Sequence, residues 1–382
     1  MANEISPSRT SARQELAARD ACYTIDVEAI RHNYRALRSH LPSSVRILAC
    51  LKRNGYGCGT GPVARALAME GVDGFAVSTL PDAISIRNAG IELPILLYPG
   101  VLPASGKTIE KLDLTVTVSS RDELASWRRA MRRTRIFIKA DVGFFRSGAT
   151  PGEISNLLAD ANACLDVDVQ GIYAHLSEFP STTPSNSTEQ FARFMDILVK
   201  AEAAGTRPPI AMISSTDGVL RNPEMDLDAV DPGALFFGIA GTEEPTRQLI
   251  LKPALKAIST SLVSVKRVDN SLGSMPDVPG FRPGMTIGVL GMGWGDGLPR
   301  QVPAQAAVLI NGRRAPLLPP VHLEHTRVDL TDIPDARFGD RVILLGQQAD
   351  QEITLQELAD QWSTDVVGLY GQLRDHVPRI YV

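Results

Sequence analysis

Lys52 stands directly behind an apolar run, where a lysine is poorly suited to packing and well suited to chemistry. The run VRILAC covers Val45 to Cys50, and Lys52 follows it by two residues. Burial of an ammonium group lowers its pKa, and a neutral amine can attack a carbonyl carbon. On position alone, the alternative is a lysine whose stem lies along the rim of the fold while its head stays in water.

The residues around Lys52 suggest a site for a phosphate group. The glycines of NGYGCGTG, which follow Lys52, allow the backbone to approach a bulky anion closely. Ser214, Ser215 and the amides around Gly233 could hold a phosphate where barrels commonly bind one. A reactive lysine beside a phosphate site suggests pyridoxal phosphate as the cofactor.

More polar side chains accompany other apolar runs of the chain. Lys139 and Asp141 end the run RIFIKAD, and Arg146 comes shortly after it. His175 ends the run VDVQGIYAH, and Asp231 precedes the run ALFFGI. If these runs are parallel strands of one barrel, the residues at their carboxyl ends meet at a single mouth. We therefore expect one catalytic site that collects them.

The apolar runs recur with the rhythm of a (β/α)8 barrel. Short, continuous apolar runs are typical of strands covered on both faces, and the segments between them, such as TGPVARALAMEG, have helical spacing. The expected strands are Val45–Cys50, Gly74–Ser78, Pro94–Gly100, Leu114–Val118, Arg135–Asp141, Val167–His175, Pro209–Ser214 and Ala234–Ile239. The predicted fold class is α/β, with this barrel as the larger domain.

After about residue 250 the rhythm changes to strands separated by proline and glycine turns. Examples are ALKAISTSLVSVKRV and DRVILLGQ, which have no long helical segment between them. This pattern predicts a mostly β C-terminal domain. We expect a flexible tail at residues 1–20, a cofactor-binding barrel at 21–250 and the β domain at 251–382.

Composition excludes several classes of protein. The 39 Lys and Arg residues and 43 Asp and Glu residues give a net charge of −4, which argues against nucleic acid or a membrane surface as partner. No apolar run approaches the length of about 18 residues that a membrane span needs, and the polar first twenty residues lack the core of a secretory signal. The 4 cysteines include no CxxC pair. We expect a cytoplasmic protein with free thiols.

From about residue 23 to residue 382 the sequence resembles the alanine racemase family. LKRNGYGCG is similar to that family's Lys-x-x-x-Tyr-Gly-His-Gly motif, and IKADVGFFRSG is similar to its Lys-x-Asp-x-Gly-x-x-Arg-x-Gly run. GIYAHLSEF matches its histidine strand, and VPRIYV matches its C-terminus. The resemblance implies a barrel that binds pyridoxal phosphate, followed by a β domain. It also implies a homodimer in which the β domain of one chain covers the barrel mouth of the other.

The resemblance implies a role for each matching residue. Lys52 would be the Schiff-base lysine and a catalytic acid/base, Arg146 would hold the carboxylate of a small amino-acid substrate, and Lys139 would be a candidate carbamylated lysine beside it. His175 would be catalytic and would also contact the cofactor. The remaining expected cofactor contacts are Tyr56, Ser214, Ser215, Asp231, Gly233 and Ala234.

Two residues depart from the family's pattern at catalytic positions. The family places the arginine of Val-Arg-Pro-Gly at the pyridine nitrogen, where this chain has Asp231. A carboxylate there favours the protonated ring, a stronger electron sink, although Asp231 could instead cap the turn before Pro232. The family's second acid/base is the tyrosine of Gly-Tyr-x-Asp-Gly, where this chain has Trp294. An indole cannot exchange a proton in that role.

A third departure offers a substitute base. The family's Val-Ser-Met-Asp-Gln segment corresponds to residues 321–325 of this chain. On a strand, His322 and Glu324 would point to one face and His325 to the other, which suits an acid/base at the mouth better than a metal site. We therefore expect His322 to be the substitute base, Leu323 to lie beside the substrate, and the site to use no metal.

These features together predict an enzyme that depends on pyridoxal phosphate and acts at the Cα of a small amino acid. The first hypothesis is an amino-acid racemase or related isomerase with an altered second base. A lyase, aldolase or transaminase that needs one base is the alternative favoured by Asp231 and Trp294. A cofactor-binding protein without turnover is the third hypothesis, and the presence of Lys52, Arg146 and His175 argues against it.

Overall fold

The computed structural model describes residues 20–177, 186–241, 245–269, 271, 273–274 and 278–382. The tail expected at 1–20 lies outside the described residues, except for Asp20. The described residues form two units. One unit is Val27–Ala254, and the other combines residues 20–26 with Leu255–Val382.

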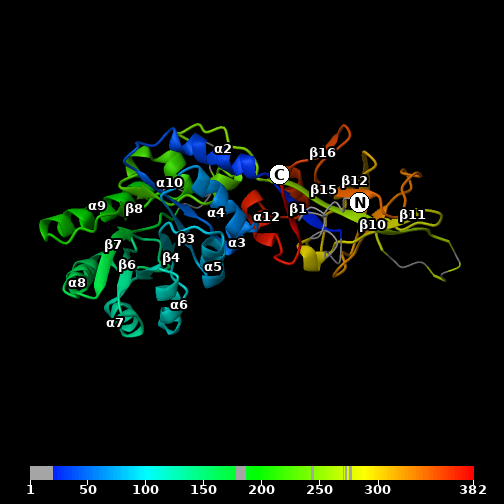
Figure 1. Cartoon of the computed structure of the whole chain (residues 1–382). Coiled ribbons are helices and arrows are strands. Elements are labelled where there is room, and N and C mark those ends of the chain that lie inside the picture. Colours follow the sequence, from blue (N-terminus) through cyan, green and yellow to red (C-terminus); the bar gives the residue numbers. More distant parts are fainter. Residues whose placement is uncertain (1–19, 178–185, 242–244, 270, 272, 275–277) are drawn as a thin grey trace, which may run out of the picture. The chain divides into compact units, whose positions relative to one another are not determined.

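Eight parallel strands close into a barrel within Val27–Ala254, which confirms the predicted barrel (Figure 1). They are β2 (Arg46–Cys50), β3 (Gly74–Val77), β4 (Ile95–Leu97), β5 (Thr115–Val118), β6 (Thr134–Lys139), β7 (Val167–Tyr173), β8 (Ala211–Met212) and β9 (Ala229–Val230). The last strand pairs with the first through Ala229 and Arg46. β3 and β5 are buried along their whole length, because side chains fill the barrel inside and helices cover it outside.

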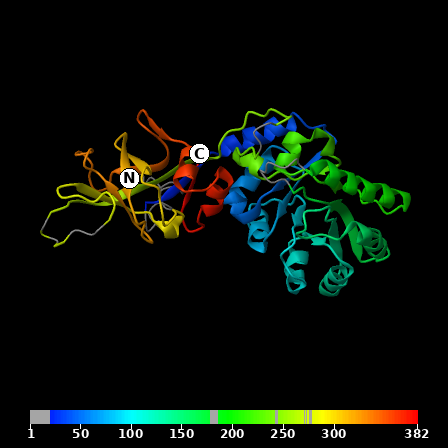
Figure 2. The same ribbon diagram turned by 180° about the vertical axis from the view of Figure 1, so that it is seen from behind.

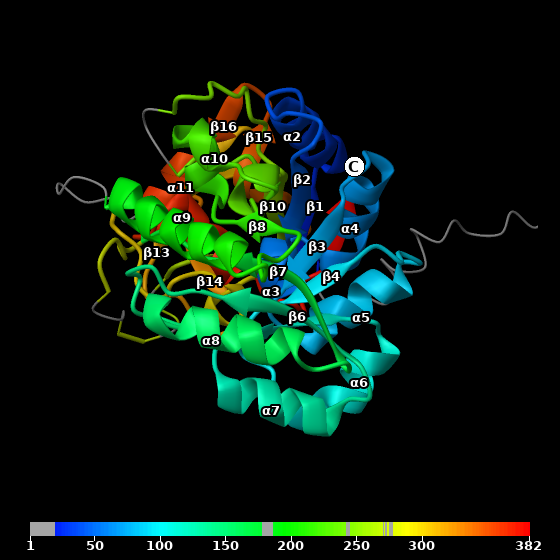
Figure 3. The ribbon, with the colours of Figure 1, turned by 90° about the vertical axis from the view of Figure 1, so that its left-hand side faces the viewer.

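Helices cover the outside of the barrel, as three views of the chain show (Figures 1, 2 and 3). They include α2 (Val27–Arg38), α4 (Thr60–Met69), α5 (Leu80–Asn88), α6 (Gly106–Lys111), α7 (Arg121–Ala130), α8 (Pro151–Asn162), α9 (Ser187–Ala203) and α10 (Thr216–Arg221). The hydroxyls of Thr79 and Ser120 cap α5 and α7, and Thr150 forms a capping box with Glu153 at the start of α8. Local sequence therefore sets where these helices begin. Among the described helices, none has the length and apolar character needed to cross a membrane.

The eighth expected strand, Ala234–Ile239, is wrong. Residues Ala234–Phe237 form a short 3-10 helix, η3, and the strand that closes the barrel is β9, just before Asp231. The apolar side chains of η3 are buried, so their run resembles a strand although the backbone is helical. The consequence is chemical, because Asp231 now follows a barrel strand. It lies at the same carboxyl end as Lys52.

The second unit is built on a nine-stranded sheet. In sheet order its strands are β16 (Gln351–Ile353), β15 (Arg341–Gln348), β12 (Ala307–Ile310), β13 (Arg313–Leu318), β14 (Thr326–Asp329), β11 (Thr286–Leu290), β10 (Leu255–Arg267), β1 (Cys22–Ile25) and β17 (Arg379–Tyr381). The helices α11 (Leu355–Gln361) and α12 (Val366–Gln372) precede β17. The mostly β character predicted for the C-terminal residues is confirmed.

The strand β1 belongs to this sheet, although the sequence assigned residues 21–26 to the barrel. It pairs antiparallel with β10 and parallel with β17, and Figure 1 shows it in blue among the yellow to red strands. The Sγ atom of Cys22 lies 3.3 Å from Oγ of Ser259 on β10. The domain boundaries predicted at residues 20 and 250 therefore stay predictions. In the structure, β1 pairs with strands of the second unit.

Candidate active site

Lys52 lies at the carboxyl end of β2 with its amine against an aromatic ring. Its Nζ is 4.4 Å from the ring centroid of Tyr98, a buried residue just after β4. Backbone hydrogen bonds fix the end of β2 to the segments on either side of it. Cys50 N donates to Pro232 O (3.0 Å), and Leu51 N donates to Ala76 O (2.9 Å). The ring attracts the ammonium form through its quadrupole. This placement favours a lysine held at the barrel mouth over one that trails into water.

A left-handed turn follows Lys52 and carries Tyr56. It spans α3 (Lys52–Tyr56), in which Arg53, Asn54, Gly55 and Tyr56 have φ values of 50°, 54°, 56° and 52°. This conformation costs residues that carry a Cβ atom about 1–2 kcal/mol each. Such strain persists where the surrounding structure holds it, and it is frequent at functional sites. The glycine motif therefore shapes the backbone here, in addition to leaving room for an anion.

Tyr56 approaches Gly233 so closely that only glycine fits. A Cβ atom on Gly233 would lie 2.3 Å from Tyr56 Oη. Burial raises the pKa of Tyr56 well above its usual value, so its hydroxyl stays protonated and can donate a hydrogen bond. The structure thus brings together two expected phosphate contacts from opposite ends of the barrel sequence.

The hydroxyl of Thr216 accepts hydrogen bonds from two backbone N–H groups next to this contact, and the sequence analysis did not predict these bonds. Its Oγ1 accepts from Gly233 N (3.2 Å) and from Leu235 N (3.3 Å). Ser214 is fully buried and donates to Met225 O (2.9 Å), whereas Ser215 is half-buried and precedes α10. Only the position of Thr216, next to the two serines, could have indicated it. Ala234, the other expected contact, begins η3.

Asp231 is a buried carboxyl group at the carboxyl end of β9. Its side chain accepts a hydrogen bond from Tyr98 Oη at 2.5 Å, and the residue is only 6% exposed. Burial raises the pKa of Asp231 to about 6, while the Tyr98 hydrogen bond and the charges of two lysines act in the opposite direction. Those lysines are Lys52 and Lys139. The carboxyl group therefore shares one electrostatic environment with the candidate nucleophile.

Lys139 ends β6 and lies among groups that disfavour its charge. Its Nζ donates to Ser147 Oγ (2.8 Å) and lies 5.5 Å from the ring centroid of Tyr173. Burial, together with the positive charges of Arg146 and Lys52, lowers the pKa of Lys139 to about 8. A neutral amine is the form that reacts with CO₂, so this pKa suits the carbamylation that the family resemblance implies.

The loop after β6 presents Arg146 to solvent. Asp141 Oδ1 accepts the backbone N–H groups of Gly143 and Phe144, both at 2.9 Å, and this folds the loop. The guanidinium of Arg146 lies 4.3 Å from the Phe144 ring centroid. A planar cation stacked on an aromatic ring keeps its hydrogen-bond donors free at its edge, which suits recognition of a carboxylate.

His175 follows β7 and is held neutral. Burial and three nearby cations lower the pKa of His175 to about 3, so its imidazole carries no charge at neutral pH. The cations are Lys52, Arg146 and Lys139. The Phe144 ring meets the imidazole edge to face, with centroids 5.6 Å apart. A neutral imidazole can hydrogen-bond a ligand or accept a proton, but it does not add positive charge to the site.

Trp294 and His322 lie together in the second unit. Trp294 begins a 3-10 helix, η5 (Trp294–Asp296), and its backbone N donates to His322 O at 2.9 Å. Gly295 N donates to Leu323 O at 2.8 Å. The indole is 37% exposed and Leu323 is 51% exposed, and the Arg300 guanidinium lies 5.8 Å from the indole centroid. These side chains form an exposed surface, and we refer to Trp294, Arg300, His322 and Leu323 as the tryptophan patch.

The strand expected at residues 321–325 is wrong. These residues form a bend before β14, in which His322 N donates to His325 O at 2.9 Å. The alternation of faces that a strand would impose on His322, Glu324 and His325 therefore does not apply. Among the described residues, no three histidine, cysteine, aspartate or glutamate side chains are placed to share a metal ion.

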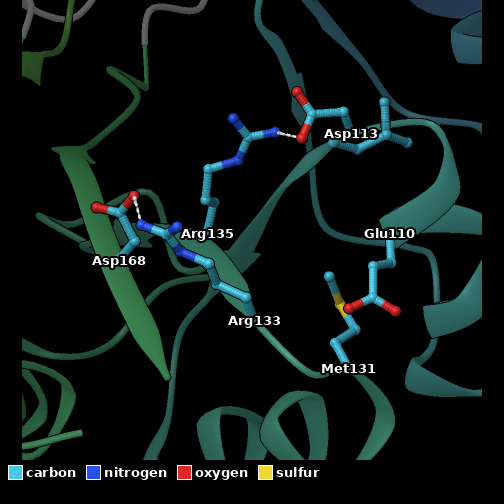
Figure 4. A pocket seen from close by; sticks show the side chains of 7 residues that line it. Glu110, Asp113, Met131, Arg133, Arg135 and Asp168 are labelled. Carbon is cyan, nitrogen blue, oxygen red and sulfur yellow. Dashed lines mark ion pairs between the residues drawn. The ribbon is translucent and has the colours of Figure 1, made fainter. Parts of the chain in front are cut away.

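A separate pocket lies at the opposite, amino end of the barrel strands (Figure 4). Its lining residues are Glu110, Asp113, Leu114, Met131, Arg133, Arg135 and Asp168. Arg135 pairs with Asp113, and Arg133 lies 3.6 Å from Asp168. No predicted site residue lines this pocket. The predicted site residues Lys52, Lys139 and Asp231 lie at the other, carboxyl end of the strands.

The carboxyl end of the barrel fits pyridoxal phosphate. It offers an amine at Lys52, a protonated phenol at Tyr56 that packs against Gly233, and a buried carboxyl group at Asp231. A glycine that no larger residue could replace, beside a protonated phenol, suits a phosphate oxygen. These three features need no residue from outside Val27–Ala254.

Comparisons with known proteins agree with this fit. Residues 25–241 match the alanine racemase N-terminal domain, and residues 280–381 match the alanine racemase C-terminal domain. An alanine racemase of Desulforamulus reducens is 31% identical over 369 residues, which cover 94% of this chain and 98% of that protein. The alanine racemase of Bacillus anthracis with bound L-Ala-P superposes with a TM-score of 0.85 at 26% identity, covering 95% of each chain.

A second solved structure gives the same result. The alanine racemase of a D-cycloserine-producing Streptomyces lavendulae has a TM-score of 0.84 at 27% identity and covers 95% of this chain and 97% of its own. The alternatives of a one-base lyase, aldolase or transaminase, and of a binding protein without turnover, gain no support from these relatives. With both domains matched across most of its length, the chain belongs to the alanine racemase family and is a pyridoxal-phosphate enzyme of the racemase type.

Proposed function

We propose that the protein interconverts the two enantiomers of a small amino acid, with alanine as the first candidate, by moving the proton on Cα. The observation that carries this proposal is the gathering of Lys52, Asp231 and Lys139 in one electrostatic environment at the carboxyl end of the barrel. Pyridoxal phosphate, when bound, withdraws electrons from Cα and so makes its proton more acidic.

The chain's own residues divide the remaining work. Lys52 holds the cofactor through Nζ and exchanges the Cα proton on one face. Arg146 holds the substrate carboxylate through the free edge of its guanidinium. Tyr56, Ser215 and the backbone at Ala234 would hold the phosphate beside Gly233, whose own N–H donates to Thr216 Oγ1.

Two groups set the charge of the site. Asp231, mostly ionised at neutral pH, would supply negative charge that favours a protonated ring nitrogen on the cofactor. His175 stays neutral and offers a hydrogen bond without adding to the cations already present.

The second proton exchange needs a group other than the Trp294 indole, and we propose His322. The imidazole is exposed in the tryptophan patch, and the His322 carbonyl is bonded to the Trp294 backbone. His322→Asn is expected to slow racemization of L-alanine by about 10²- to 10⁴-fold, because it removes one acid/base. Exchange of the Cα proton in D₂O should persist for one of the two enantiomers of alanine, the one whose proton faces Lys52, because Lys52 remains.

Chiral chromatography and mass spectrometry in D₂O measure both quantities. His325→Asn is the matched control, since this exposed histidine lies three residues away in the same bend. Trp294→Tyr is expected to raise racemization by restoring a hydroxyl that can exchange a proton. Unchanged racemization in His322→Asn would remove His322 from the mechanism. Formation of an aldehyde or keto acid without racemization would favour the one-base alternative.

We further propose a homodimer, supported by the exposed apolar side chains of Trp294 and Leu323. Neighbouring exposed apolar side chains are one mark of a surface that binds another protein, and aromatic residues are enriched at the centres of such interfaces. Sedimentation equilibrium at micromolar concentration should give twice the chain mass, and Leu323→Asp should shift the protein toward the monomer. An active wild-type monomer at that concentration would contradict the proposal.

We place the protein in the cytoplasm. All four cysteines are free, and Cys50 and Cys58 are buried beside the active-site turn. Free thiols at such positions suit a reducing compartment.

A further inference from the structure

The turn that follows Lys52 is held by a buried carboxylate from a different βα unit. Asp82, near the start of α5, is only 5% exposed. Its Oδ1 accepts from Asn54 N (2.9 Å) and from Thr60 Oγ1 (2.8 Å), and its Oδ2 accepts from Thr79 Oγ1 (2.7 Å). The carboxylate therefore joins the left-handed turn to the first residue of α4 and to the cap of α5.

These bonds are more than helix capping. At the cap of α5, the backbone N–H of Asp82 donates to Thr79 Oγ1 at 3.3 Å, and the Thr79 hydroxyl donates to Asp82 Oδ2. Both bonds to Oδ1 come from outside α5, one from the turn itself and one from Thr60 just beyond it. A second bond, from Thr60 N to Asn54 Oδ1 (3.1 Å), ties the same two segments together. The carboxylate thus acts on the turn through Oδ1 as well as on the cap of its own helix through Oδ2.

The turn needs such support because three of its four left-handed residues carry a Cβ atom. Arg53, Asn54 and Tyr56 all have φ near +50°, a conformation that only glycine adopts at little cost. The N–H group of Asn54 lies in the middle of this stretch and points at the Asp82 carboxylate. A charged acceptor makes a stronger hydrogen bond to backbone N–H than a neutral one does.

We propose that Asp82 is a positioning residue for the active site. Its carboxylate holds the strained left-handed turn, and this turn places Lys52 at one end and Tyr56 at the other. Lys52 begins the turn and Tyr56 ends it, so a relaxed turn would move the amine and the phenol relative to each other. The inference rests on the proposed roles of these two residues. Its effect should appear first in cofactor binding and in the reactivity of Lys52, before any loss of fold.

The test compares full-length variants for cofactor affinity and for covalent capture at Lys52. Asp82→Ala should weaken binding of pyridoxal phosphate to the apoenzyme by about ten- to hundredfold. Fluorescence titration of the apoenzyme measures this affinity. Borohydride capture of the cofactor on Lys52, read by peptide mass spectrometry, should slow in parallel. Asp82→Asn, which keeps the Oδ1 acceptor, should retain most of the affinity.

Glycine provides the sharpest readout, because it removes the strain that Asp82 opposes. Arg53→Gly in the Asp82→Ala background should recover most of the affinity, since glycine adopts the left-handed conformation freely. Urea unfolding of the same variants separates this recovery from a general gain in stability. The matched control is Asp73→Ala, because Asp73 accepts Ile47 N at 2.8 Å near the other end of β2. This control should leave cofactor affinity unchanged.

Three results would overturn the inference. They are unchanged affinity and capture in Asp82→Ala, equal losses in Asp73→Ala, and no recovery with Arg53→Gly. If Asp82→Ala does not fold, Thr60→Val removes one bond to Oδ1 and should show a smaller loss of the same kind. Capture on a lysine other than Lys52 in the wild type would instead refute the proposed role of Lys52, and so separates the two failures.

Discussion

Lys52→Ala is expected to abolish racemization and to leave the purified protein without covalently captured cofactor after borohydride treatment. The rate should fall by at least about 10³-fold, because the substitution removes both the attachment point and one acid/base. The amine lies 4.4 Å from the Tyr98 ring centroid and shares its electrostatic environment with Asp231, so no solvent-exposed lysine can replace it. Chiral product analysis and peptide mass spectrometry measure the two effects.

Lys139 provides the matched control for this experiment. It is the other lysine in the same electrostatic environment, and its pKa is lowered to about 8. Lys139→Met should leave capture on Lys52 intact and should reduce the rate less than Lys52→Ala does. A borohydride-stable link that persists in Lys52→Ala, above all one on Lys139, would show that the assignment is wrong.

Asp231→Asn is expected to remove a rise of the rate with pH whose midpoint lies at or below about pH 6. The pKa of Asp231 is raised to about 6, so the carboxyl group is mostly protonated below this pH and mostly ionised above it. If the ionised form supports the protonated ring, the rate in the wild type should rise with pH, with a midpoint at or below this value because the ring's positive charge favours the carboxylate. In Asp231→Asn the rise should vanish, and the rate should stay low across the range. Steady-state kinetics between pH 5 and pH 9 would measure this change.

Asp231→Asn should lower the rate of the enzyme, but it should raise the free energy of unfolding of the apoenzyme at high pH. Burial raises the pKa of Asp231 above its unfolded value of 3.8, so protonation of this residue favours the folded state. This contribution to the free energy of unfolding is fully present below about pH 4. That contribution is lost as the pH rises through 6. Asp231→Asn should therefore stabilise the apoenzyme at pH 8 by on the order of 1–3 kcal/mol, with little gain near pH 4.

Urea unfolding of the apoenzyme at pH 4 and pH 8 measures this difference. Tyr98→Phe is the control, since it removes the hydrogen bond that lowers the Asp231 pKa and should move the kinetic transition to higher pH than in the wild type. A transition that is the same in the wild type and in both variants would assign it to another group.

Sequence reasoning found the residues whose position along an apolar run is itself the signal. Lys52, Lys139 and His175 all follow strands, and the carboxyl ends of barrel strands meet by the geometry of the fold. The eighth strand was misplaced because two residues, Ala229 and Val230, suffice to close the barrel, while the longer apolar run after them packs as η3. Periodicity cannot separate a buried strand from a short buried helix.

The residues that sequence reasoning missed act through contacts between distant segments. Tyr98 was assigned only to a strand, yet its hydroxyl reaches Asp231, 133 positions away. Asp82 looks like an ordinary acidic residue in the first turn of a helix, and nothing in its neighbours indicates that its carboxylate holds a turn from another unit. Thr216 follows two serines, and nothing in the sequence around it indicates that its hydroxyl binds backbone N–H groups near Gly233. Their roles depend on which strands lie side by side, which no local pattern reports.

The pairing of β1 means that the barrel is an insertion within the β domain rather than a domain placed before it. β1 lies between β10 and β17 in the sheet, so the chain leaves the sheet after Ile25 and returns to it at Leu255. A fragment that starts at residue 251 would lack this middle strand and leave the backbone groups of β10 and β17 unpaired at two open edges. For protein engineering, the severable piece is the inserted barrel, Val27–Ala254. The β domain can be excised intact only if residues 20–26 are joined to it, for example by circular permutation.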